Sequence, residues 1–330
     1  MDPIYSSATA QARAIRESKI SSEELLRAHI KRINKVNPCL NAVVQLPVDA
    51  ALAEARMADE ALARGELKGP LHGVPFTLKD AIETRGVICT GGTKGRAKYV
   101  PREDATVVRR LRAAGAILLG KTNCPELGWA WEADNLIYGR TNNPYDLALS
   151  PGGSSGGESA IIAAGGSPLG LGSDAGGSVR FPAHCTGIAS LKPTSGRVPR
   201  TGHFPGPGSV LDPLWQIGPL ARYVEDLALV LPVIAGPDWR DPAIVPALLG
   251  DPSTVDLKKL RLGFYLDNGI EAPAREITEA VKKAALELEG AGIRIEQAQP
   301  AALPATYEIF LDLFTTDGGA GITALLEEAG

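Results

Sequence analysis

Residues 150–183 read SPGGSSGGESAIIAAGGSPLGLGSDAGGSVRFPA. Two Gly-Gly-Ser units, which end at Ser154 and Ser178, are separated by a predicted helix over 157–164 and a predicted strand over 169–171. A glycine-serine run alone is typical of a flexible linker. Because this run is interleaved with fully apolar elements, we expect its glycines inside the fold, where backbone N–H groups can point into a cavity. That arrangement suits an oxyanion hole.

Short apolar runs alternate with helical patterns on both sides of this stretch. The first long helix is predicted to begin after Ser21, because Ser21 and Glu24 together form a capping box. Asp104 is predicted to cap a third helix, which runs to Gly115. The predicted helices are 22–36, 48–64, 105–115, 157–164 and 224–234, and the predicted buried strands are 42–46, 74–78, 116–119 and 169–171.

The last quarter of the chain continues this alternation. It has predicted strands at 260–265 and 292–297, a predicted helix at 275–289 and two further helical stretches. Strands alternating with helices indicate an α/β fold, with a mixed twisted central sheet and helices on both faces.

The order of these segments predicts one domain over residues 1–330, because no internal repeat or low-complexity linker divides the chain. We expect a long surface loop over 202–213 and a turn at 218–220, since both are rich in glycine and proline. The expected parts of the domain are an N-terminal helical region (1–65), a core (66–240) and a variable α/β part (241–330).

The composition excludes several classes of function. The 330 residues are 44% hydrophobic and carry a formal net charge of −4 without long runs of one sign, so neither nucleic acid nor a membrane is expected as a partner. The four cysteines stand far apart, with no pairing at metal-ligand spacing, so we expect free thiols and no metal or other cofactor. No signal pattern or apolar run of membrane-spanning length is present, which predicts a cytoplasmic protein.

A nucleophilic serine needs a base, and two familiar motifs do not supply it. Gly152–Gly156 matches the GxSxG pattern, but Ser150-Pro151 precedes it where a nucleophile elbow needs a strand. Gly115–Thr122 matches the phosphate-binding P-loop pattern, but it follows a helix and is apolar enough to be a core strand itself. The four histidines could be ordinary surface or core residues. Lys79, at the end of a predicted strand, remains as the base candidate, although such a lysine is usually a solvated charge.

Four motifs together resemble the amidase signature family. They are GVPFTLKD (73–80), GGSSGGESA (152–160), GSDAGGSVRFPA (172–183) and LKPTSGRV (191–198). Lys79 precedes Ser154 by 75 positions, and Ser178 follows Ser154 by 24, in the order of the family's Ser-cisSer-Lys set. The resemblance implies that Ser178 is the nucleophile, that Ser154 follows a cis peptide bond and relays protons, and that Lys79 is the base.

The resemblance also implies the roles of residues around the three. Backbone N–H groups of Ala175, Gly176, Gly177 and Ser178 would form the oxyanion hole. Asp174 and Arg180 would brace the loop as an ion pair, with Ser155 and Ser173 as supporting hydrogen-bond partners. The cavity wall would include aromatic side chains, which are Trp129, Trp131, Phe181 and Phe204, although aromatic residues there could equally be core.

These roles imply hydrolysis of amide bonds in small apolar or aryl substrates, with esters and carbamates open to the same chemistry. One alternative is the amidase subunit of a tRNA-dependent amidotransferase, which usually carries a polar residue where this chain has Phe181. Another is a non-catalytic binding protein on the same fold. A homodimer is left open. Because members of the family are as a rule longer, the C-terminal part, which stops in a helical pattern at 324–330, is expected to be incomplete.

Overall fold

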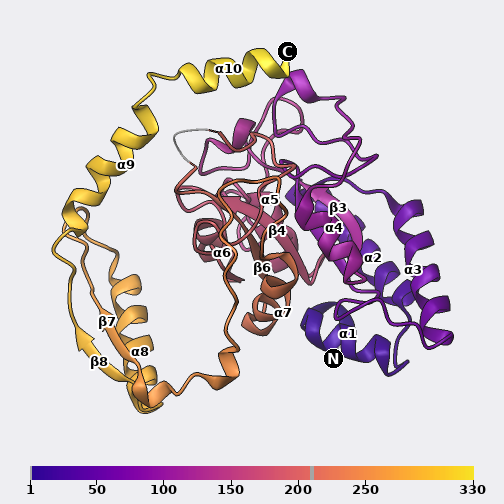
Figure 1. Ribbon diagram of the computed structural model, residues 1–330, viewed down its shortest axis with the longest axis horizontal. Helices are drawn as coiled ribbons and strands as arrows, with labels where there is room; N and C mark the ends of the chain where they lie inside the picture. The colour runs from indigo at the N-terminus through magenta and orange to yellow at the C-terminus, as the bar shows by residue number, and fades with distance from the viewer. Residues whose placement is uncertain (1, 209–211) are drawn as a thin grey trace. The chain divides into compact units, whose positions relative to one another are not determined.

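The computed structural model describes residues 2–208 and 212–330 (Figure 1). The chain divides into two compact units. The first unit holds the residues up to Ala247 together with Gly321–Gly330, and the second holds Leu248–Ala320. The expectation of a single domain stays a prediction.

A six-stranded mixed sheet forms the centre of the first unit. Its strand order is β1-β3-β2-β4-β6-β5, and β2 runs parallel to both β3 and β4 while the other pairs are antiparallel. β2, β3, β4 and β6 are buried along their whole length, as is typical of strands in a sheet that is covered on both faces. The strands are β1 (Val43–Gln45), β2 (Pro75–Lys79), β3 (Ile117–Thr122), β4 (Leu169–Asp174), β5 (Ala189–Ser190) and β6 (Gln216–Ala221).

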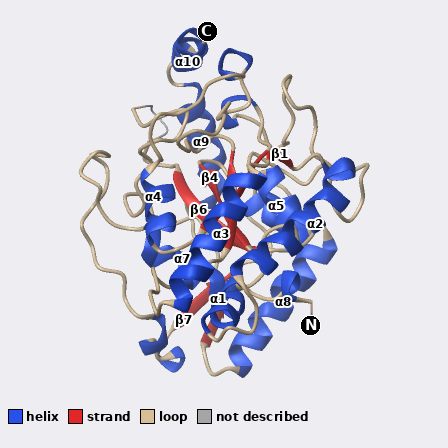
Figure 2. Cartoon of the chain, turned by 90° about the vertical axis from the view of Figure 1, so that its right-hand side faces the viewer, coloured by secondary structure: helices blue, strands red, loops and turns tan. Residues whose placement is uncertain are grey.

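Helices enclose this sheet, as Figure 2 shows. α3 and α4 contact β3, α5 contacts β4, and α7 contacts β6. The helices are α1 (Ala8–Arg16), α2 (Ser22–Leu40), α3 (Val48–Ala63), α4 (Thr106–Ala113), α5 (Gly156–Ala163), α6 (Arg180–Thr186) and α7 (Val224–Ile234), with short 3₁₀ turns at Pro3–Tyr5, Lys94–Arg96 and Glu126–Gly128. A last helix, α10 (Ala320–Ala329), belongs to this unit from Gly321 onward. The predicted α/β class with a mixed sheet is confirmed, and so is a strand, not a P-loop, at 117–122.

Two predicted helix boundaries are wrong. α2 continues through Pro38 to Leu40 and ends only where Asn41 adopts a left-handed conformation (φ 50°). The side chain of Asn37 supports this end, since its Oδ1 accepts from the N–H groups of Ala42 and Val43. The sequence placed the end at Pro38, but proline near a C-terminus costs only one hydrogen bond of the last turns.

Asp104 does not cap α4. The residue before the helix is Ala105, with no side-chain cap, and Asp104 Oδ1 accepts instead from the N–H of Arg85 (2.8 Å). Its other oxygen accepts from Arg112 Nη1 (3.2 Å). The carboxylate is therefore used for a tertiary contact, which nothing local in the sequence indicated.

The turn predicted at 218–220 is also wrong, because these residues lie in the middle of β6. Gly218 pairs with Gly172 and Pro219 with Leu171 of β4. A Cβ atom at Gly218 would collide with the Leu191 carbonyl, so glycine is required there by close strand packing rather than by a turn. The expected loop over 202–213 includes residues 209–211, which lie outside the described residues; its described part contains no helix or sheet strand.

The N-terminal helix is fastened to a helix more than 200 residues later. Asp226, in the first turn of α7, accepts hydrogen bonds from the N–H groups of Ala8 (2.9 Å) and Thr9 (2.8 Å) and from the Thr9 hydroxyl (2.8 Å). Arg222 adds a bond from Nη2 to the Ile4 carbonyl (2.6 Å). The start of α1 is thus capped by a distant carboxylate as well as by Ser7.

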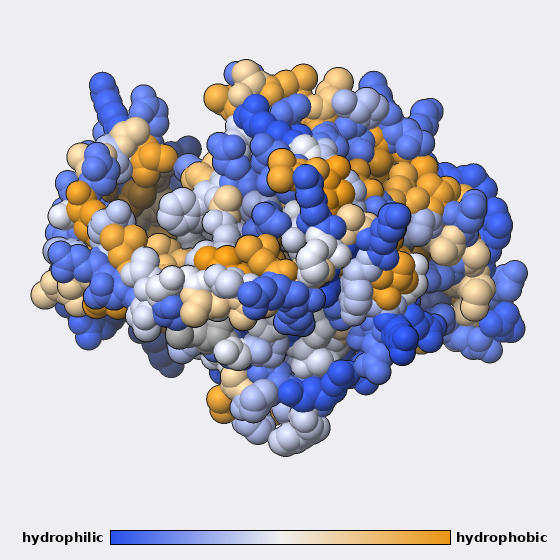
Figure 3. Space-filling view, turned by 90° about the horizontal axis from the view of Figure 1, so that it is seen from above, coloured by the Kyte–Doolittle hydropathy of each residue, from blue (hydrophilic) through white to orange (hydrophobic). Residues whose placement is uncertain are grey.

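The second unit is a small α/β segment with little buried surface. Ala285 and Ile293 are its buried hydrophobic residues among those described. Many larger apolar side chains are exposed, and exposed apolar groups appear as orange patches in Figure 3. The unit contains the parallel strands β7 (Arg261–Phe264) and β8 (Arg294–Gln297), the helices α8 (Arg275–Gly290) and α9 (Thr306–Thr315), and 3₁₀ turns at Pro252–Thr254, Leu257–Lys259 and Leu303–Ala305. The strands and helices predicted in this segment are confirmed.

Across the described residues, no single helix has the length and apolar character needed to cross a membrane. One interrupted pair, Leu303–Thr315 with Ala320–Ala329, meets those two criteria only when its helices are taken together.

Candidate active site

Lys79 ends β2 and is almost completely buried, with 1% of its surface exposed. Its Nζ lies 2.5 Å from Ser154 Oγ and 3.0 Å from Ser173 Oγ. Burial lowers the pKa of Lys79 from 10.5 to about 8, and the nearby Cys124 and Asp174 oppose this shift only in part. A lysine in this state can be neutral close to physiological pH, so its amine can accept a proton.

Ser154 is presented by a loop without a strand before it, as the sequence indicated. The peptide bond between Gly153 and Ser154 is cis, as expected, and α5 begins two residues later at Gly156. The loop packs tightly against the segment after β3: a Cβ atom at Gly153 would lie 2.6 Å from the N atom of Glu132. Only glycine fits at this approach, which explains the glycine before the serine.

Ser178 lies between β4 and α6, and 7% of its surface is exposed. Its carbonyl accepts a hydrogen bond from the N–H of Ser155 (3.0 Å), so the two glycine-serine loops are tied together through their backbones. Its hydroxyl makes no hydrogen bond to any described residue. The structure therefore joins Lys79, Ser154 and Ser173 by direct side-chain contacts and brings Ser178 beside them through the backbone.

The N–H groups expected to form an oxyanion hole differ in availability. The Gly177 N–H already donates to Asp174 Oδ1 (2.8 Å). Within the described part of the chain, no acceptor faces the N–H groups of the other three, which are Ala175, Gly176 and Ser178. Three of the four expected donors therefore make no hydrogen bond to another described residue.

Asp174 and Arg180 form the expected ion pair. Arg180 Nη2 and Nε donate to the two carboxylate oxygens at 2.8 and 2.9 Å, and the N–H groups of Gly177 and Val179 add two more bonds to Asp174. Burial raises the pKa of Asp174, but the bonds from Arg180 and from these N–H groups outweigh it and leave the pKa below its ordinary value. Asp174 thereby fixes the backbone between β4 and α6. Ser155 Oγ contacts the backbone O and N atoms of Ser173, each at 3.4 Å.

Comparison with known proteins agrees with the motifs. The family model for amidases matches residues 24–327. The chain belongs to the amidase family.

Curated amidase-family relatives are longer than this chain. The indoleacetamide hydrolase of Bradyrhizobium diazoefficiens is 38% identical over 328 residues, which cover 98% of this chain and 61% of the relative. One subunit of the glutamyl-tRNA(Gln) amidotransferase of Chloroflexus aurantiacus is 44% identical over 284 residues, which cover 83% of this chain and 58% of the relative. The chain thus spans about three fifths of the length of these relatives.

Solved amidase-family structures have the same fold. A fatty acid amide hydrolase aligns with a TM-score of 0.90 and 30% identity, covering 99% of this chain and 58% of that one. A bacterial aryl acylamidase of the amidase signature family aligns with a TM-score of 0.87 and 30% identity, covering 98% of this chain and 68% of that one.

The aromatic residues expected at the substrate cavity of this amidase-family chain fall into two groups. Trp129, Trp131 and Phe181 are 39%, 55% and 42% exposed, so they are not core residues. Trp131 Nε1 also donates to the Gly176 carbonyl (3.1 Å), which places it against the loop that carries Ser178. Phe204 is only 5% exposed, and the Arg96 guanidinium carbon lies 3.9 Å from the centroid of the Phe204 ring. Phe204 therefore belongs to the core and not with the other three.

The sequence reasoning missed two residues at the site. Gly128 has φ +74°, and a Cβ atom there would lie 3.5 Å from Ser154 Oγ and 3.7 Å from Lys79 Nζ, so its backbone closes one side of this pair. His203 Nε2 lies 2.8 Å from Ser173 Oγ. The sequence around His203 is a Gly/Pro-rich loop, which carries no signal of this contact.

No group of three or more His, Cys, Asp or Glu side chains in the described ranges is arranged to hold a metal ion. The four cysteines are free thiols; Cys89 and Cys124 are buried and Cys39 is exposed.

Proposed function

We propose that this chain is an amidase that hydrolyses small apolar or aryl amides through an acyl-enzyme on Ser178, with Ser154 as the relay and Lys79 as the base. The observation that carries the proposal is the 2.5 Å contact between Lys79 Nζ and Ser154 Oγ, made by a buried lysine whose pKa is lowered to about 8. An ordinary surface lysine would hold a proton at neutral pH and could not act as a base.

In the proposed reaction, protons pass from Ser178 to Ser154 and from Ser154 to Lys79. Ser178 Oγ attacks the substrate carbonyl carbon while its proton passes to Ser154, whose own proton passes to the neutral amine of Lys79. The N–H groups of Ala175, Gly176 and Ser178 would hold the resulting oxyanion. The carbon–nitrogen bond then breaks as the leaving amine takes the proton back through Ser154. A water molecule repeats the sequence to release the acid and free Ser178.

The substrate class is argued from the exposed aromatic side chains. Trp129, Trp131 and Phe181 offer apolar area beside the nucleophile loop, which favours aryl or acyl-chain amides over small charged ones. Esters and carbamates react through the same tetrahedral intermediate and belong to the same proposal. The small-molecule partner and a cytoplasmic location, where free thiols stay reduced, are parts of this proposal.

Intact-mass analysis after incubation with a fluorophosphonate tests the nucleophile, the relay and the base together. We expect one adduct on Ser178, no adduct in Ser178→Ala, and strongly slowed labelling in Ser154→Ala and Lys79→Ala. Ser253→Ala, which changes an exposed serine of a 3₁₀ turn in the second unit, is the matched control and should label like the wild type. Labelling that survives in Ser178→Ala, on protein with an unchanged circular dichroism spectrum, would overturn the proposal.

A second candidate function is the amidase subunit of a tRNA-dependent amidotransferase. The observation that favours it is the 44% identity to one subunit of a glutamyl-tRNA(Gln) amidotransferase. Release of ammonia from glutamine only in the presence of the partner subunits of such a complex would support it. Hydrolysis of aryl amides by the chain alone would support the first proposal. A folded chain without labelling or amide hydrolysis under either condition would instead indicate the non-catalytic alternative.

A further inference from the structure

His203 lies on the far side of Ser173 from Lys79, in a chain of four polar groups. Its Nε2 is 2.8 Å from Ser173 Oγ, and its Nδ1 is 2.8 Å from the Pro205 carbonyl oxygen. Ser173 Oγ in turn is 3.0 Å from Lys79 Nζ. His203 therefore contacts the amine of Lys79 only through the Ser173 hydroxyl.

The partners of His203 decide which way each hydrogen bond runs. A carbonyl oxygen can only accept, so Nδ1 must carry the proton and donate it to Pro205. Burial lowers the pKa of His203 to about 3; the charges of Lys121 and Arg200, and of Lys79 whenever it is protonated, act in the same direction, while the hydrogen bond to the Pro205 carbonyl opposes them in part. The ring is therefore neutral, and Nε2 holds a lone pair. Ser173 must donate its hydroxyl proton to this lone pair.

This direction limits what Ser173 can do toward Lys79. With its proton given to His203, the Ser173 oxygen can only accept, and it accepts an N–H of Lys79. A neutral amine has two N–H groups and one lone pair. Since one N–H points to Ser173, the lone pair is left for the hydroxyl of Ser154, which lies at 2.5 Å. A Ser173 hydroxyl without His203 could turn and donate to that same lone pair, in competition with Ser154.

We propose that His203 is a positioning residue that fixes the proton of the Ser173 hydroxyl, so that neutral Lys79 presents its lone pair to Ser154. This inference rests on the proposed function, in which Lys79 is the base.

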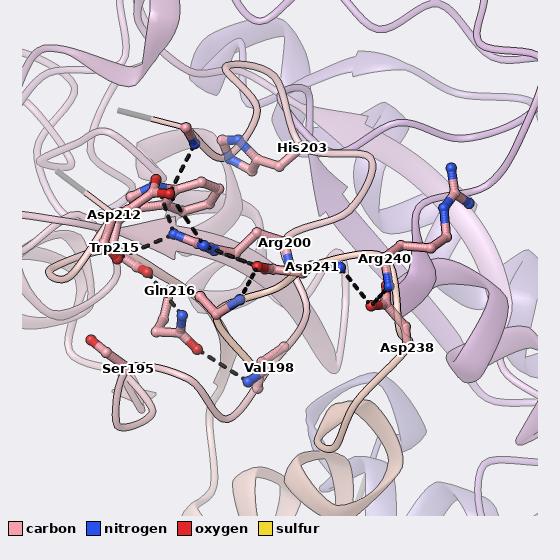
Figure 4. A network of polar contacts seen from close by, with 12 residues as sticks. Ser195, Val198, Arg200, His203, Asp212, Trp215, Gln216, Asp238, Arg240 and Asp241 are labelled. Carbon is pink, nitrogen blue, oxygen red and sulfur yellow. Dashed lines mark hydrogen bonds and ion pairs between the residues drawn. The ribbon is translucent and has the colours of Figure 1, made fainter. Parts of the chain in front are cut away.

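The His203 ring lies beside a network of polar side chains, which Figure 4 shows. The ring packs against Trp215 with centroids 4.7 Å apart, and Trp215 Nε1 donates to Asp212 Oδ1 (3.1 Å). The guanidinium of Arg200 lies 4.8 Å from the centroid of the Trp215 ring and donates to Asp241 from Nε (2.9 Å) and Nη2 (3.0 Å). Because every charged group of this network is paired, the histidine has a rigid support.

Two substitutions of His203 distinguish the hydrogen bond made by Nδ1 from the one made by Nε2. In His203→Asn the shorter amide can still donate to the Pro205 carbonyl but cannot reach Ser173. In His203→Gln the amide oxygen can take the place of Nε2 and accept from Ser173. We expect the plateau rate of fluorophosphonate labelling to fall about tenfold or more in His203→Asn, the scale of one hydrogen bond to a reacting group, and to recover most of this loss in His203→Gln.

The pH profile of labelling distinguishes this role from a structural one. The titratable groups that face Lys79 are Cys124, Asp174 and His203, and none of them is changed in charge by these substitutions. In His203→Asn a donating Ser173 would stabilise the neutral amine, so the apparent pKa should fall below the wild-type value while the plateau falls. Loosened packing would instead admit water and move the apparent pKa upward, toward the ordinary 10.5 of a lysine.

A double-variant cycle tests whether His203 acts through Ser173. In the Ser173→Ala background, adding His203→Asn should not change the labelling rate further. Equal rates for His203→Asn and His203→Gln would overturn the inference, as would an equal loss in both backgrounds or an upward shift of the apparent pKa.

A measurement on the unchanged protein keeps the inference testable if a variant does not fold. Nitrogen-15 NMR of labelled histidine should show His203, assigned in the unchanged protein by correlating its ring signals with its backbone signals, as the neutral tautomer with protonated Nδ1 from pH 6 to 9. Protonated Nε2 would overturn the inference. If Lys79→Ala labels like the wild type, the proposed function fails. If Lys79→Ala is slow and the His203 variants match the wild type, only the inference fails.

Discussion

The two sheets of the molecule are built from similar sequence patterns but differ in burial. β4 of the first unit and β7 of the second both pair in parallel with a neighbouring strand. All six residues of β4 are buried, whereas three of the four in β7 are exposed. The difference teaches that periodicity predicts where strands form, while the chemistry of the proposed site depends on burial, which only the first sheet provides.

The pH dependence of acylation is the largest effect expected from this burial. Because the pKa of Lys79 is lowered to about 8, the neutral fraction rises about tenfold per pH unit below pH 8 and levels off above it. The fluorophosphonate labelling rate should therefore rise about a hundredfold from pH 5.5 to 7.5. A flat profile from pH 6 to 9 would mean that buried Lys79 is not the base.

Truncation of one leucine in each unit tests the difference in packing. Leu171 in β4 is fully buried, so Leu171→Ala should cost about 2–5 kcal/mol of unfolding free energy. Leu286 in α8 is 67% exposed, so Leu286→Ala should change it by less than about 0.5 kcal/mol. Urea unfolding followed by far-ultraviolet circular dichroism measures both. Equal costs would show that the second unit is covered in solution.

An added methyl group in each sheet gives a smaller contrast. A Cβ atom at Gly170 of β4 would press on Glu158 Oε1 and lie 2.8 Å from the Thr77 carbonyl, so Gly170→Ala should cost about 1–3 kcal/mol. At Gly263 of β7 the nearest atom would be 3.8 Å away, so Gly263→Ala should stay within about 0.5 kcal/mol of the wild type. Thermal melts of the pair measure the contrast, and a larger loss for Gly263→Ala would reverse the comparison.

Helix and turn caps provide the smallest contrast. Ser21 Oγ accepts from the N–H of Glu24 (3.0 Å) at the start of α2, so Ser21→Ala should cost about 1 kcal/mol. Asp251 caps only the exposed turn at Pro252–Thr254, and Asp251→Ala should leave the unfolding curve unchanged. A measurable loss in Asp251→Ala would show that this turn is coupled to the rest of the chain.

Sequence patterns predicted those helices and strands whose ends depend on neighbouring residues in the sequence. The helix expected at 224–234 has those bounds, and the strand expected at 116–119 overlaps the first half of β3, which begins at Ile117. β6 was missed because Gly218 and Pro219 are typical of turns, while their strand pairing depends on β4, more than 40 residues earlier. Asp104 was misread for the same reason: its partner Arg85 is distant in sequence.

The residues of the proposed site likewise divide into those that motifs indicate and those that only the folded structure reveals. The resemblance of four motifs to the amidase signature family indicated Lys79, Ser154 and Ser178, and the structure places the first two in contact. No motif could show that Gly177 already uses its N–H, that Phe204 lies under Arg96, or that His203 reaches Ser173. These facts depend on how loops fold back on the sheet, and loops carry no periodicity from which to infer it.

The cap on α1 by Asp226 can form only late in the synthesis of the chain. Ala8 and Thr9 leave the ribosome long before Asp226 is made, and β4 likewise waits for β6. At about 5–20 residues per second, translation separates the two ends of this contact by roughly 10–40 s. The first unit can therefore close only after most of its chain has emerged, and until then its unpaired strands expose backbone groups and apolar side chains that can aggregate.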